Sequence, residues 1–452
     1  MLYDLGFLIF SVIYLPTLVF KGRLHRDFPE RFGRYDKIKE RALLSGRDRI
    51  WIQAVSVGEV ALCRTLIPLL KESFPRRDLV ISTITKSGND LAKKLFSKDA
   101  IIIYFPLDFS FTVKRAVKYI KPGIYIMVET EIWPNLLNEL SLKSVPSIMI
   151  NGRISDRSIG KYRLAKPFLK NVISKIRSLC MQDSIDADRV ISLGAQPDRV
   201  KVTGNMKFDA EAPASVGTAD SIRRSLRLDE GDMLLVAGST HNGEEEMIVE
   251  AFKELVTEFP KLKLLIAPRH IDRVRAVENV IKRYEFEPVR VSRLNESQTT
   301  LPALGADRPG GKNERRIMIL DTIGHLNEAY SIAMLVFVGG SLVKHGGQNP
   351  LEPAILGKAI IFGNHMFNFR YITKVLLQED GAVQVAGKKE LTDELRKLVN
   401  DPSRRADLGE NAKMAIAKNR GATRRNLEKI GEILRCPSTR FTCSGHGERV
   451  EP

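Results

Sequence analysis

One carboxylate marks the first place where this sequence could do chemistry. Glu59 closes the stretch WIQAVSVGE, in which the apolar run from Trp51 to Val57 predicts a buried strand. Glu59 therefore stands where a strand passes into a helix, directly after Gly58, a residue type that lets backbone approach a ligand closely. A carboxylate in that place can act as general base on a hydroxyl group. The alternative is that it only stabilises the N-terminus of its helix, by about 0.3–1 kcal/mol.

Further charged residues follow later strands of the same half of the chain. IMVETEIWPN places Glu129 and Glu131 at a strand end, where alternate residues share a face, so the pair is an acid–base candidate. The alternative is that one of them caps the helix starting at WPN and the other pairs with an arginine. Lys207, in VTGNMKFD, follows the last of these strands and could neutralise a leaving phosphate.

A glycine-rich segment, FVGGSLVKHGGQNPLEPAILGKAIIFG, dominates the second half of the chain. Gly346 and Gly347 let backbone approach a ligand, and Pro350 suits the first turn of a helix. The N-terminus of that helix is a ready anion site, and Glu352 could accept hydrogen bonds from a ribose. The segment favours nucleotide binding over a simple turn followed by a carboxylate that stabilises its helix dipole.

Two other strand ends belong to the same half. Arg269, in IAPRH, could pair bidentately with a phosphate, and the backbone of LDTIGHL, residues 320–326, could frame a base. Neither GxGxxG at a strand-to-helix turn nor GxxxxGK[ST] occurs, which argues against NAD-type and P-loop chemistry. The histidines show no HExxH spacing and the four cysteines no CxxC pair, so we expect neither a metal site nor a cofactor, and reduced thiols throughout.

The elements that must position these residues alternate between short β-rich runs and helical spacings from residue 50 onward. Such alternation predicts parallel strands with right-handed crossovers, in two Rossmann-like domains. We expect an N-terminal domain over 21–209, a small, polar linker at 210–221, a C-terminal domain over 222–435 and a disordered tail at 436–452. Because ligands of such sheets bind outside the carboxyl ends of the strands, the site is expected between the two sets of strand ends.

The charge balance and the first residues indicate an anionic surface. The chain has a formal net charge of +17, and residues 1–20 form an apolar run with one charge, Asp4. Ten Lys/Arg against five Asp/Glu follow between Lys21 and Arg49, which predicts a membrane anchor with the rest of the chain in the cytoplasm. A buried helix of a soluble domain is the alternative. No nucleic-acid recognition motif appears and 7% aromatic content is not enriched, so no nucleic-acid partner is expected.

Seven motifs stand in an order that resembles one family. They are SVGE, ETEIWPN, VTGNMKFD, GSTHNGEEE, PRH, LDTIGHL and FVGGSLVKHGGQNPLEP, and PERFGRY after the apolar segment adds to them. The set is similar to the 3-deoxy-D-manno-octulosonic acid (Kdo) transferases of lipopolysaccharide synthesis, over about residues 1–435. The resemblance implies an α/β glycosyltransferase of the GT-B type, anchored at the inner membrane with both domains on its cytoplasmic face.

The resemblance also implies the substrates. The donor would be CMP-Kdo, bound by the C-terminal domain, and the acceptor the tetra-acylated lipid A precursor, lipid IVA, approached by the N-terminal domain. The transfer would invert the anomeric centre. The alternative is another GT-B enzyme that uses a UDP-sugar and a lipid-linked acceptor; it would share the glycine-rich stretch but not SVGE and ETEIWP.

Site residues carry over by motif. Glu59 matches the catalytic base, and Glu129 and Lys207 match positions that stabilise the transition state. Three segments match CMP contacts: Pro268 and Arg269; Ile323, Gly324 and His325; and Asn349, Pro350, Leu351 and Glu352. The chain departs from the pattern at Gln53 and at Gln348, where the family usually has histidine, and both positions bear on fine geometry more than on the reaction.

Overall fold

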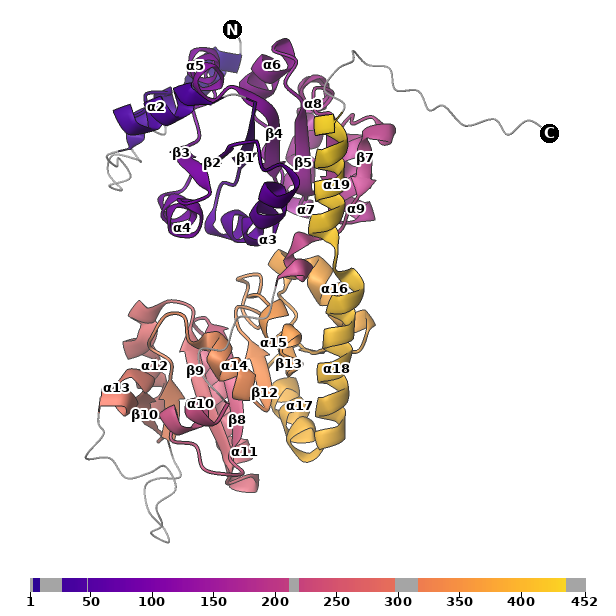
Figure 1. Ribbon diagram of the computed structural model, residues 1–452. Helices are drawn as coiled ribbons and strands as arrows, with labels where there is room; N and C mark the ends of the chain where they lie inside the picture. Colours follow the sequence, from indigo (N-terminus) through magenta and orange to yellow (C-terminus); the bar gives the residue numbers. More distant parts are fainter. Residues whose placement is uncertain (1–2, 9–26, 47, 211–218, 297–315, 436–452) are drawn as a thin grey trace, which may run out of the picture. The chain divides into compact units, whose positions relative to one another are not determined.

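The computed structural model describes residues 3–8, 27–46, 48–210, 219–296 and 316–435. It contains two compact units, each an α/β structure around its own sheet (Figure 1). The first unit is formed by the residues up to Ala210 together with those from Arg420 onward, and the second by Glu211–Asn419. The prediction of two α/β domains with parallel sheets is confirmed.

The first unit is built on a seven-stranded parallel sheet with the order β3-β2-β1-β4-β5-β6-β7. Its strands are β1 (Arg49–Gln53), β2 (Leu79–Thr83), β3 (Ala100–Tyr104), β4 (Pro122–Val128), β5 (Ser147–Gly152), β6 (Ser178–Met181) and β7 (Val200–Val202). The chain runs from β1 outward to β3 and then returns to place β4 on the other side of β1. The carboxyl ends of β1 and β4 therefore form the topological switch point, where open α/β sheets bind ligands.

The strands form because their apolar runs can bury both faces of the sheet. On β1, Ile50 and Ile52 enter one core cluster, whereas Trp51 between them enters the cluster on the opposite face. On β4, Ile124 and Tyr125 divide in the same way. This two-sided burial is what parallel sheets covered by helices require.

Helices cover both faces of this sheet. They are η1 (Phe28–Phe32), α2 (Lys37–Ser45), α3 (Val57–Ser73), α4 (Lys86–Phe96), α5 (Ser110–Ile120), α6 (Pro134–Leu142), α7 (Asp156–Leu164), α8 (Lys166–Ile173), α9 (Ser184–Ser192), η2 (Pro197–Arg199), η3 (Met206–Asp209) and α19 (Ala422–Arg435). The helix α3 begins at Val57, so Glu59 lies inside its first turn.

The second unit repeats the design with a parallel sheet of order β10-β11-β9-β8-β12-β13-β14, whose switch point lies between β8 and β12. Its strands are β8 (Met233–Thr240), β9 (Leu262–Pro268), β10 (Glu287–Arg290), β11 (Arg316–Ile319), β12 (Leu335–Val338), β13 (Ala359–Gly363) and β14 (Val383–Val385). Its helices are α10 (Ala219–Ser225), α11 (Glu244–Glu258), η4 (Ile271–Arg273), α12 (Val274–Arg283), α13 (Val291–Glu296), α14 (Leu326–Ile332), α15 (Leu351–Ile355), η6 (Phe367–Phe369), α16 (Arg370–Gln378), α17 (Lys388–Asn400) and α18 (Pro402–Asn419).

The predicted end of the second domain, residue 435, is wrong, because α19 belongs to the first unit (yellow in Figure 1). Ala422, Ile430 and Leu434 are buried in the same core cluster as the apolar face of α3. The carboxylate of Asp209 accepts hydrogen bonds from the N–H groups of Gly421 (2.6 Å) and Thr423 (2.5 Å), which satisfies two donors at the start of α19. Burial and capping together hold this helix on the first sheet.

The predicted linker and tail lie mostly outside the described residues. Residues 211–218 and 436–452 are not described, and α10 begins at Ala219, inside the predicted linker.

The predicted membrane anchor, 1–20, is described only at residues 3–8, which are helical. Asp4 accepts hydrogen bonds from the N–H of Ser110 (2.9 Å) and from Asn135 Nδ2 (2.8 Å), so this short helix is attached to α5 and α6. Residues 9–20 of the anchor lie outside the description. Within the described ranges, every helix is too short or too polar to cross a membrane.

Candidate active site

Glu59 occupies the turn between β1 and α3, at the switch point of the first sheet. Its carboxylate accepts a hydrogen bond from the N–H of Val55 (2.6 Å) and another from the hydroxyl of Ser56 (3.0 Å). The residue is 9% exposed, so its carboxylate is nearly buried at this edge of the sheet. Both partners precede α3, so these bonds do not cap the helix but hold the carboxylate at the edge of the sheet.

The environment of Glu59 raises the pKa of its carboxyl group to about 7. Burial is the main cause, the nearby charge of Glu129 adds to it, and Lys207 acts in the opposite direction. The structure thus brings the three predicted catalytic residues into one electrostatic neighbourhood. A carboxylate with a pKa near the working pH is well suited to accept a proton.

Glu129 does not lie on a strand, so the alternation argument for the acidic pair is wrong. β4 ends at Val128, and Glu129 takes a left-handed backbone conformation (φ 62°), with its N–H donated to the carbonyl oxygen of Ile150 (2.9 Å). A non-glycine residue in this conformation is uncommon and costs energy, which is typical of functional positions.

Glu131 nevertheless belongs to the same acidic group. Burial raises the pKa of its carboxyl to about 8, and the charges of Glu59 and Glu129 contribute. Its carboxylate accepts a hydrogen bond from Trp133 Nε1 (3.0 Å). The start of α6 is capped instead by Asp108, whose carboxylate accepts the N–H groups of Asn135 (3.0 Å) and Leu136 (2.9 Å), so neither glutamate is needed as its cap.

Lys207 lies on η3, the short turn after β7, which contacts α3. Three buried amide side chains hold this turn. Asn151 Oδ1 accepts the N–H of Met206 (2.9 Å), Gln182 Nε2 donates to the carbonyl oxygen of Asn151 (3.1 Å), and Asn205 Nδ2 donates to Gln182 Oε1 (3.0 Å). None of these residues was predicted as part of the site, although each lies at the end of β5, β6 or β7 or just after it.

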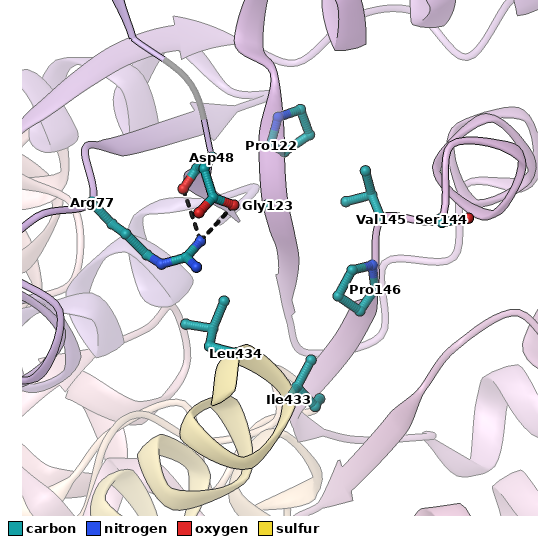
Figure 2. Close-up of a pocket in the computed structure, with 9 residues that line it drawn as sticks. All are labelled: Asp48, Arg77, Pro122, Gly123, Ser144, Val145, Pro146, Ile433 and Leu434. Carbon is teal, nitrogen blue, oxygen red and sulfur yellow. Dashed lines mark hydrogen bonds and ion pairs between the residues drawn. The ribbon is translucent and has the colours of Figure 1, made fainter. Parts of the chain in front are cut away.

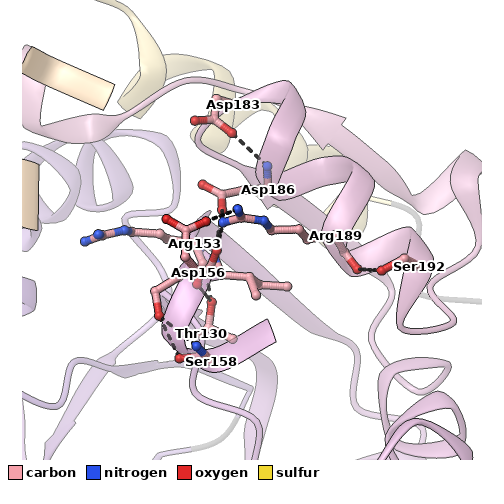
Figure 3. A network of polar contacts seen from close by, with 10 residues as sticks. Thr130, Arg153, Asp156, Ser158, Asp183, Asp186, Arg189 and Ser192 are labelled. Atoms are coloured by element: carbon pink, nitrogen blue, oxygen red, sulfur yellow. Dashed lines mark hydrogen bonds and ion pairs between the residues drawn. The ribbon is translucent and has the colours of Figure 1, made fainter. Parts of the chain in front are cut away.

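A second polar network fixes the ends of β5 and β6 beside the acidic group (Figure 3). The N–H of Arg153 donates to the hydroxyl of Thr130 (3.1 Å), which ties the turn after β4 to the end of β5. Asp186 accepts the N–H of Ile154 (2.9 Å), and Arg189 donates to the carbonyl oxygen of Ile154 (2.5 Å). These contacts restrain the backbone next to Glu129.

Gln53, the first departure from the family pattern, is fully buried at the end of β1. Its Oε1 accepts a hydrogen bond from the hydroxyl of Ser82, which in turn accepts from Trp51 Nε1 (2.8 Å). Gln53 therefore supports the strand beneath the site and is not exposed to a substrate.

In the second unit, a buried carboxylate shapes the glycine-rich segment. Glu244, in the first turn of α11, accepts four backbone hydrogen bonds of 2.6–2.9 Å. The donors are the N–H groups of His241, Gly340, Ser341 and Leu342. GSTHNGEEE was singled out by resemblance, and the structure shows that its first glutamate holds the loop after β12 in place.

Three residues predicted to bind CMP come together at the carboxyl edge of the second sheet. Burial raises the pKa of Glu352, whereas the hydrogen bond from Asn349 Nδ2 (3.1 Å) and the charge of Arg269 lower it, so Arg269 acts on Glu352 through space. Asn349 Oδ1 also accepts the N–H of Leu351 (3.2 Å), which fixes the start of α15. Pro350 is the N-cap residue of α15 and lies just before its first turn.

The remaining residues that were predicted to bind CMP differ in their exposure to solvent. Pro268 and Leu351 are buried and can offer only backbone to a ligand. Ile323 is 87% exposed, and beside Gly324 a side chain would meet only open space. His325 is exposed at the N-cap of α14, with its Nδ1 2.9 Å from Glu328 Oε2. The loop 321–325 is therefore an open surface that could pack against a planar base.

A cavity of about 210 Å³ lies at the opposite edge of the first sheet, where its strands begin (Figure 2). It is lined by Pro122, Val145, Pro146 and Leu434, and by the ion pair of Arg77 with Asp48 (2.7 Å), among others. None of the predicted site residues contributes to it. The candidate active site lies at the carboxyl edge and this cavity does not.

Comparison with known proteins defines first the class and then the family. A solved glycosyltransferase from Rickettsia africae superposes with a TM-score of 0.61 at 12% identity, over 86% of this chain and 100% of that one. This likeness concerns the fold alone, and it agrees with a two-domain glycosyltransferase of the GT-B type.

Closer relatives give the family. The family model of 3-deoxy-D-manno-octulosonic-acid transferase (kdotransferase) matches residues 26–210. A 3-deoxy-D-manno-octulosonic acid transferase of Haemophilus influenzae is 33% identical over 415 residues, covering 91% of this chain and 92% of that protein. That of Chlamydophila psittaci is 29% identical over 441 residues, covering 96% of both. The chain belongs to the Kdo transferase family and is a glycosyltransferase of lipopolysaccharide biosynthesis, as its motifs predicted.

Proposed function

We propose that this enzyme transfers Kdo from CMP-Kdo to the tetra-acylated lipid A precursor, lipid IVA, with inversion at the anomeric carbon. The observation that carries the proposal is the placement of Glu59. It is a nearly buried carboxylate with a pKa of about 7, held by Val55 and Ser56 at the switch point of the first sheet. Glu59 of the first unit alone removes the proton from the acceptor hydroxyl, so no acidic residue of the second unit is needed for this step.

The chemistry needs such a base because a sugar hydroxyl is a poor nucleophile. As the acceptor oxygen bonds to the anomeric carbon of Kdo, Glu59 takes its proton, and the bond from that carbon to the CMP phosphate oxygen breaks. Attack opposite the leaving CMP inverts the anomeric centre. Lys207 offers positive charge against the negative charge that develops on the departing phosphate, and Glu129 acts with it in stabilising the transition state.

The donor is proposed to bind the second unit. Arg269 is exposed after β9 and suits the single phosphate of CMP, while Glu352 and Asn349 at the start of α15 suit the hydroxyl groups of the ribose. The exposed loop with Ile323, Gly324 and His325 suits the base. All of these groups flank the carboxyl edge of the second sheet, where a nucleotide is expected.

The direct test is to incubate the enzyme with CMP-Kdo and lipid IVA and to determine the mass of the lipid product and its anomeric configuration by NMR. We expect a mass increase of one or more Kdo residues, release of CMP, and inverted configuration. Release of UDP from a UDP-sugar, without turnover of CMP-Kdo, would favour the other GT-B reaction instead. Retained configuration would refute the single-displacement scheme.

We also propose that the enzyme works on the anionic inner membrane, with both units on the cytoplasmic face. The helix 3–8 supports this, because its rings pack on aromatic side chains of the first unit: Tyr3 stacks on Phe168 (5.9 Å) and Phe7 packs edge-on against Phe109 (4.9 Å). Around them lie exposed apolar residues, of which Leu164 is 88% and Phe111 63% exposed. We call this the apolar surface; it consists of Leu5, Leu8, Phe111, Leu164 and Phe168.

Basic side chains flank the apolar surface on α7 and α8. Lys161, Arg163, Lys166 and Lys170 are all exposed there. Apolar groups bordered by lysine and arginine suit a leaflet with anionic headgroups, each basic residue contributing about 1 kcal/mol near such a surface.

Co-sedimentation with vesicles tests the membrane proposal. Deletion of residues 1–20, and separately the Leu164→Asp/Phe168→Asp double variant, should each lower binding to vesicles that contain phosphatidylglycerol. Met414→Asp, an exposed apolar position of the second unit, serves as control and should bind as the wild type does. If all variants remain fully bound, the membrane contact lies elsewhere.

A further inference from the structure

Three histidines converge in the second unit at a place to which no role has yet been given. His241 follows β8, His270 follows β9 and Arg269, and His345 lies in the glycine-rich segment. The ring of His241 stacks on that of His345, with centroids 4.1 Å apart and planes inclined by 18°, and it meets the ring of His270 edge-on at 6.1 Å. We call these three residues the histidine cluster.

His241 forms the floor of the cluster and the other two form its rim. His241 is 8% exposed, whereas His270, His345 and the adjacent Arg269 are exposed. The cluster therefore opens to solvent at the carboxyl edge of the sheet and can be reached by a ligand.

Gln348, the second departure from the family pattern, determines the hydrogen bonding of His241. Its Nε2 lies 3.0 Å from Nε2 of His241. Because an amide nitrogen can only donate, the imidazole Nε2 accepts and the ring keeps its proton on Nδ1. The second nitrogen of His241 is thus a donor whose direction is fixed by Gln348.

The cluster is electropositive. Burial lowers the pKa of His241 to about 4, so this ring is neutral, and the positive charges of Arg273 and Arg269 act in the same direction. Nearby acids are engaged elsewhere: Glu245 pairs with Arg273 (2.7 Å), and Glu244 accepts four backbone N–H groups. An anion that entered here would meet donors and positive charge.

A metal ion does not explain the arrangement. Within the described ranges, no group of three or more His, Cys, Asp or Glu side chains is arranged to hold one. One imidazole nitrogen of His241 is bonded to the amide of Gln348, which leaves the other nitrogen as a donor for a ligand.

We propose that the histidine cluster is the subsite for the carboxylate of the donor sugar. The proposal rests on the proposed function. In CMP-Kdo the anomeric carbon carries both the phosphate and a carboxylate, so two negative groups lie within a few bonds of each other. Arg269 takes the phosphate, and the histidine cluster beside it takes the carboxylate. A neutral hexose would leave these donors unpaired, so the cluster selects a keto sugar acid over a neutral sugar.

The test separates sugar recognition from nucleotide recognition. Steady-state transfer to lipid IVA gives the KM for CMP-Kdo, and inhibition by CMP, which has no carboxylate, gives its Ki. In His345→Ala and His241→Asn, the KM should rise roughly ten- to a hundredfold, while the Ki for CMP changes by less than about threefold. His365→Ala, a histidine of the same unit outside the cluster, should leave both constants as in the wild type.

Several outcomes would overturn the proposal. An unchanged KM in both cluster variants would remove the subsite, and a parallel rise of KM and Ki would assign the cluster to the phosphate. Because His345 is exposed, its variant carries the test even if His241→Asn folds poorly. Failure of the wild-type enzyme to use CMP-Kdo at all would instead refute the proposed function and is distinguished by the same assay.

Discussion

The N–H of Val55 donates a 2.6 Å hydrogen bond to the carboxylate of Glu59, so the side chain folds back over the turn that joins β1 to α3. This contact fixes where the carboxylate oxygens lie without depending on a bound substrate. It also means that substitution of Glu59 affects local structure and chemistry together, and the experiments have to separate the two.

Glu59→Gln should lower turnover by roughly two to four orders of magnitude, because the amide keeps the size of the side chain and one hydrogen-bonding oxygen but cannot take a proton. Thermal stability should change little, and CMP affinity not at all. Glu72→Gln, at an exposed position of the same helix, is the matched control. If Glu59→Gln keeps more than about a third of wild-type turnover, Glu59 is a structural cap and not the base.

The pH dependence of catalysis should follow the raised pKa of Glu59. Since the base must be deprotonated, kcat/KM for the acceptor should fall about tenfold per pH unit below about 7 and level off above it. Glu129→Gln removes the neighbouring negative charge that helps to raise the pKa of Glu59, so the acidic limb should move to lower pH. A profile unchanged in Glu129→Gln would mean that the charge of Glu129 does not act on Glu59.

The raised pKa of Glu59 also predicts that the free energy of unfolding changes with pH. The folded-state pKa of Glu59, about 7, lies above the ordinary value of 4.5 for a glutamate, so the folded state binds the proton more tightly. The resulting stabilisation is fully present below about pH 4.5 and is lost as the pH rises through about 7. Glu59→Gln should flatten this part of the curve of unfolding free energy against pH, measured by urea titration, whereas Glu72→Gln should not.

Glu244→Gln should selectively affect the second unit, which is proposed to bind CMP-Kdo. The introduced amide NH2 would face backbone N–H groups that now donate to a carboxylate, leaving donors unsatisfied at a cost of roughly 1–3 kcal/mol. We expect a lower unfolding temperature and weaker CMP binding by calorimetry. Glu246→Gln, in the same helical turn, should have little effect on either. Unaltered CMP affinity in a folded Glu244→Gln protein would separate the loop from the nucleotide site.

Asn151→Ala should reduce kcat by misplacing Lys207. The change removes the acceptor for the N–H of Met206 and frees the turn η3, while the CMP-binding residues of the second unit are unchanged. Kinetics with CMP-Kdo should therefore show a lowered kcat and a nearly constant KM for CMP-Kdo. Lys207→Met should lower kcat in the same way, and by more. A donor KM that rises as much as kcat falls would indicate a wider structural effect.

The strands and the position of Glu59 were predictable because each depends on a local pattern. Uninterrupted apolar runs such as those of β1 and β4 indicate strands buried on both faces, and the residue after such a run lies at the carboxyl edge. By contrast, EPVR, which forms β10, has no apolar run that would indicate a strand. Its strand pairing depends on the neighbouring β11 and leaves little trace in its own residues.

Other features depend on contacts between distant segments. The amphipathic pattern of α19 shows that one face is buried, but nothing in it says which sheet that face covers. Likewise, the left-handed backbone of Glu129 and the acceptor role of Glu244 follow from loops brought close by the fold. The stacking of His241 on His345 joins residues more than a hundred positions apart, and no spacing rule could have paired them.

The return of α19 to the first unit has a consequence for biosynthesis. Ala422, Ile430 and Leu434 complete a core whose other members come from the first half of the chain. During translation, the part of this core that α19 covers therefore stays exposed while the entire second unit, Glu211–Asn419, is made, for about 10–40 seconds at 5–20 residues per second. The second unit, continuous in sequence, can fold as soon as it emerges, so the unit synthesised first is the last to be completed.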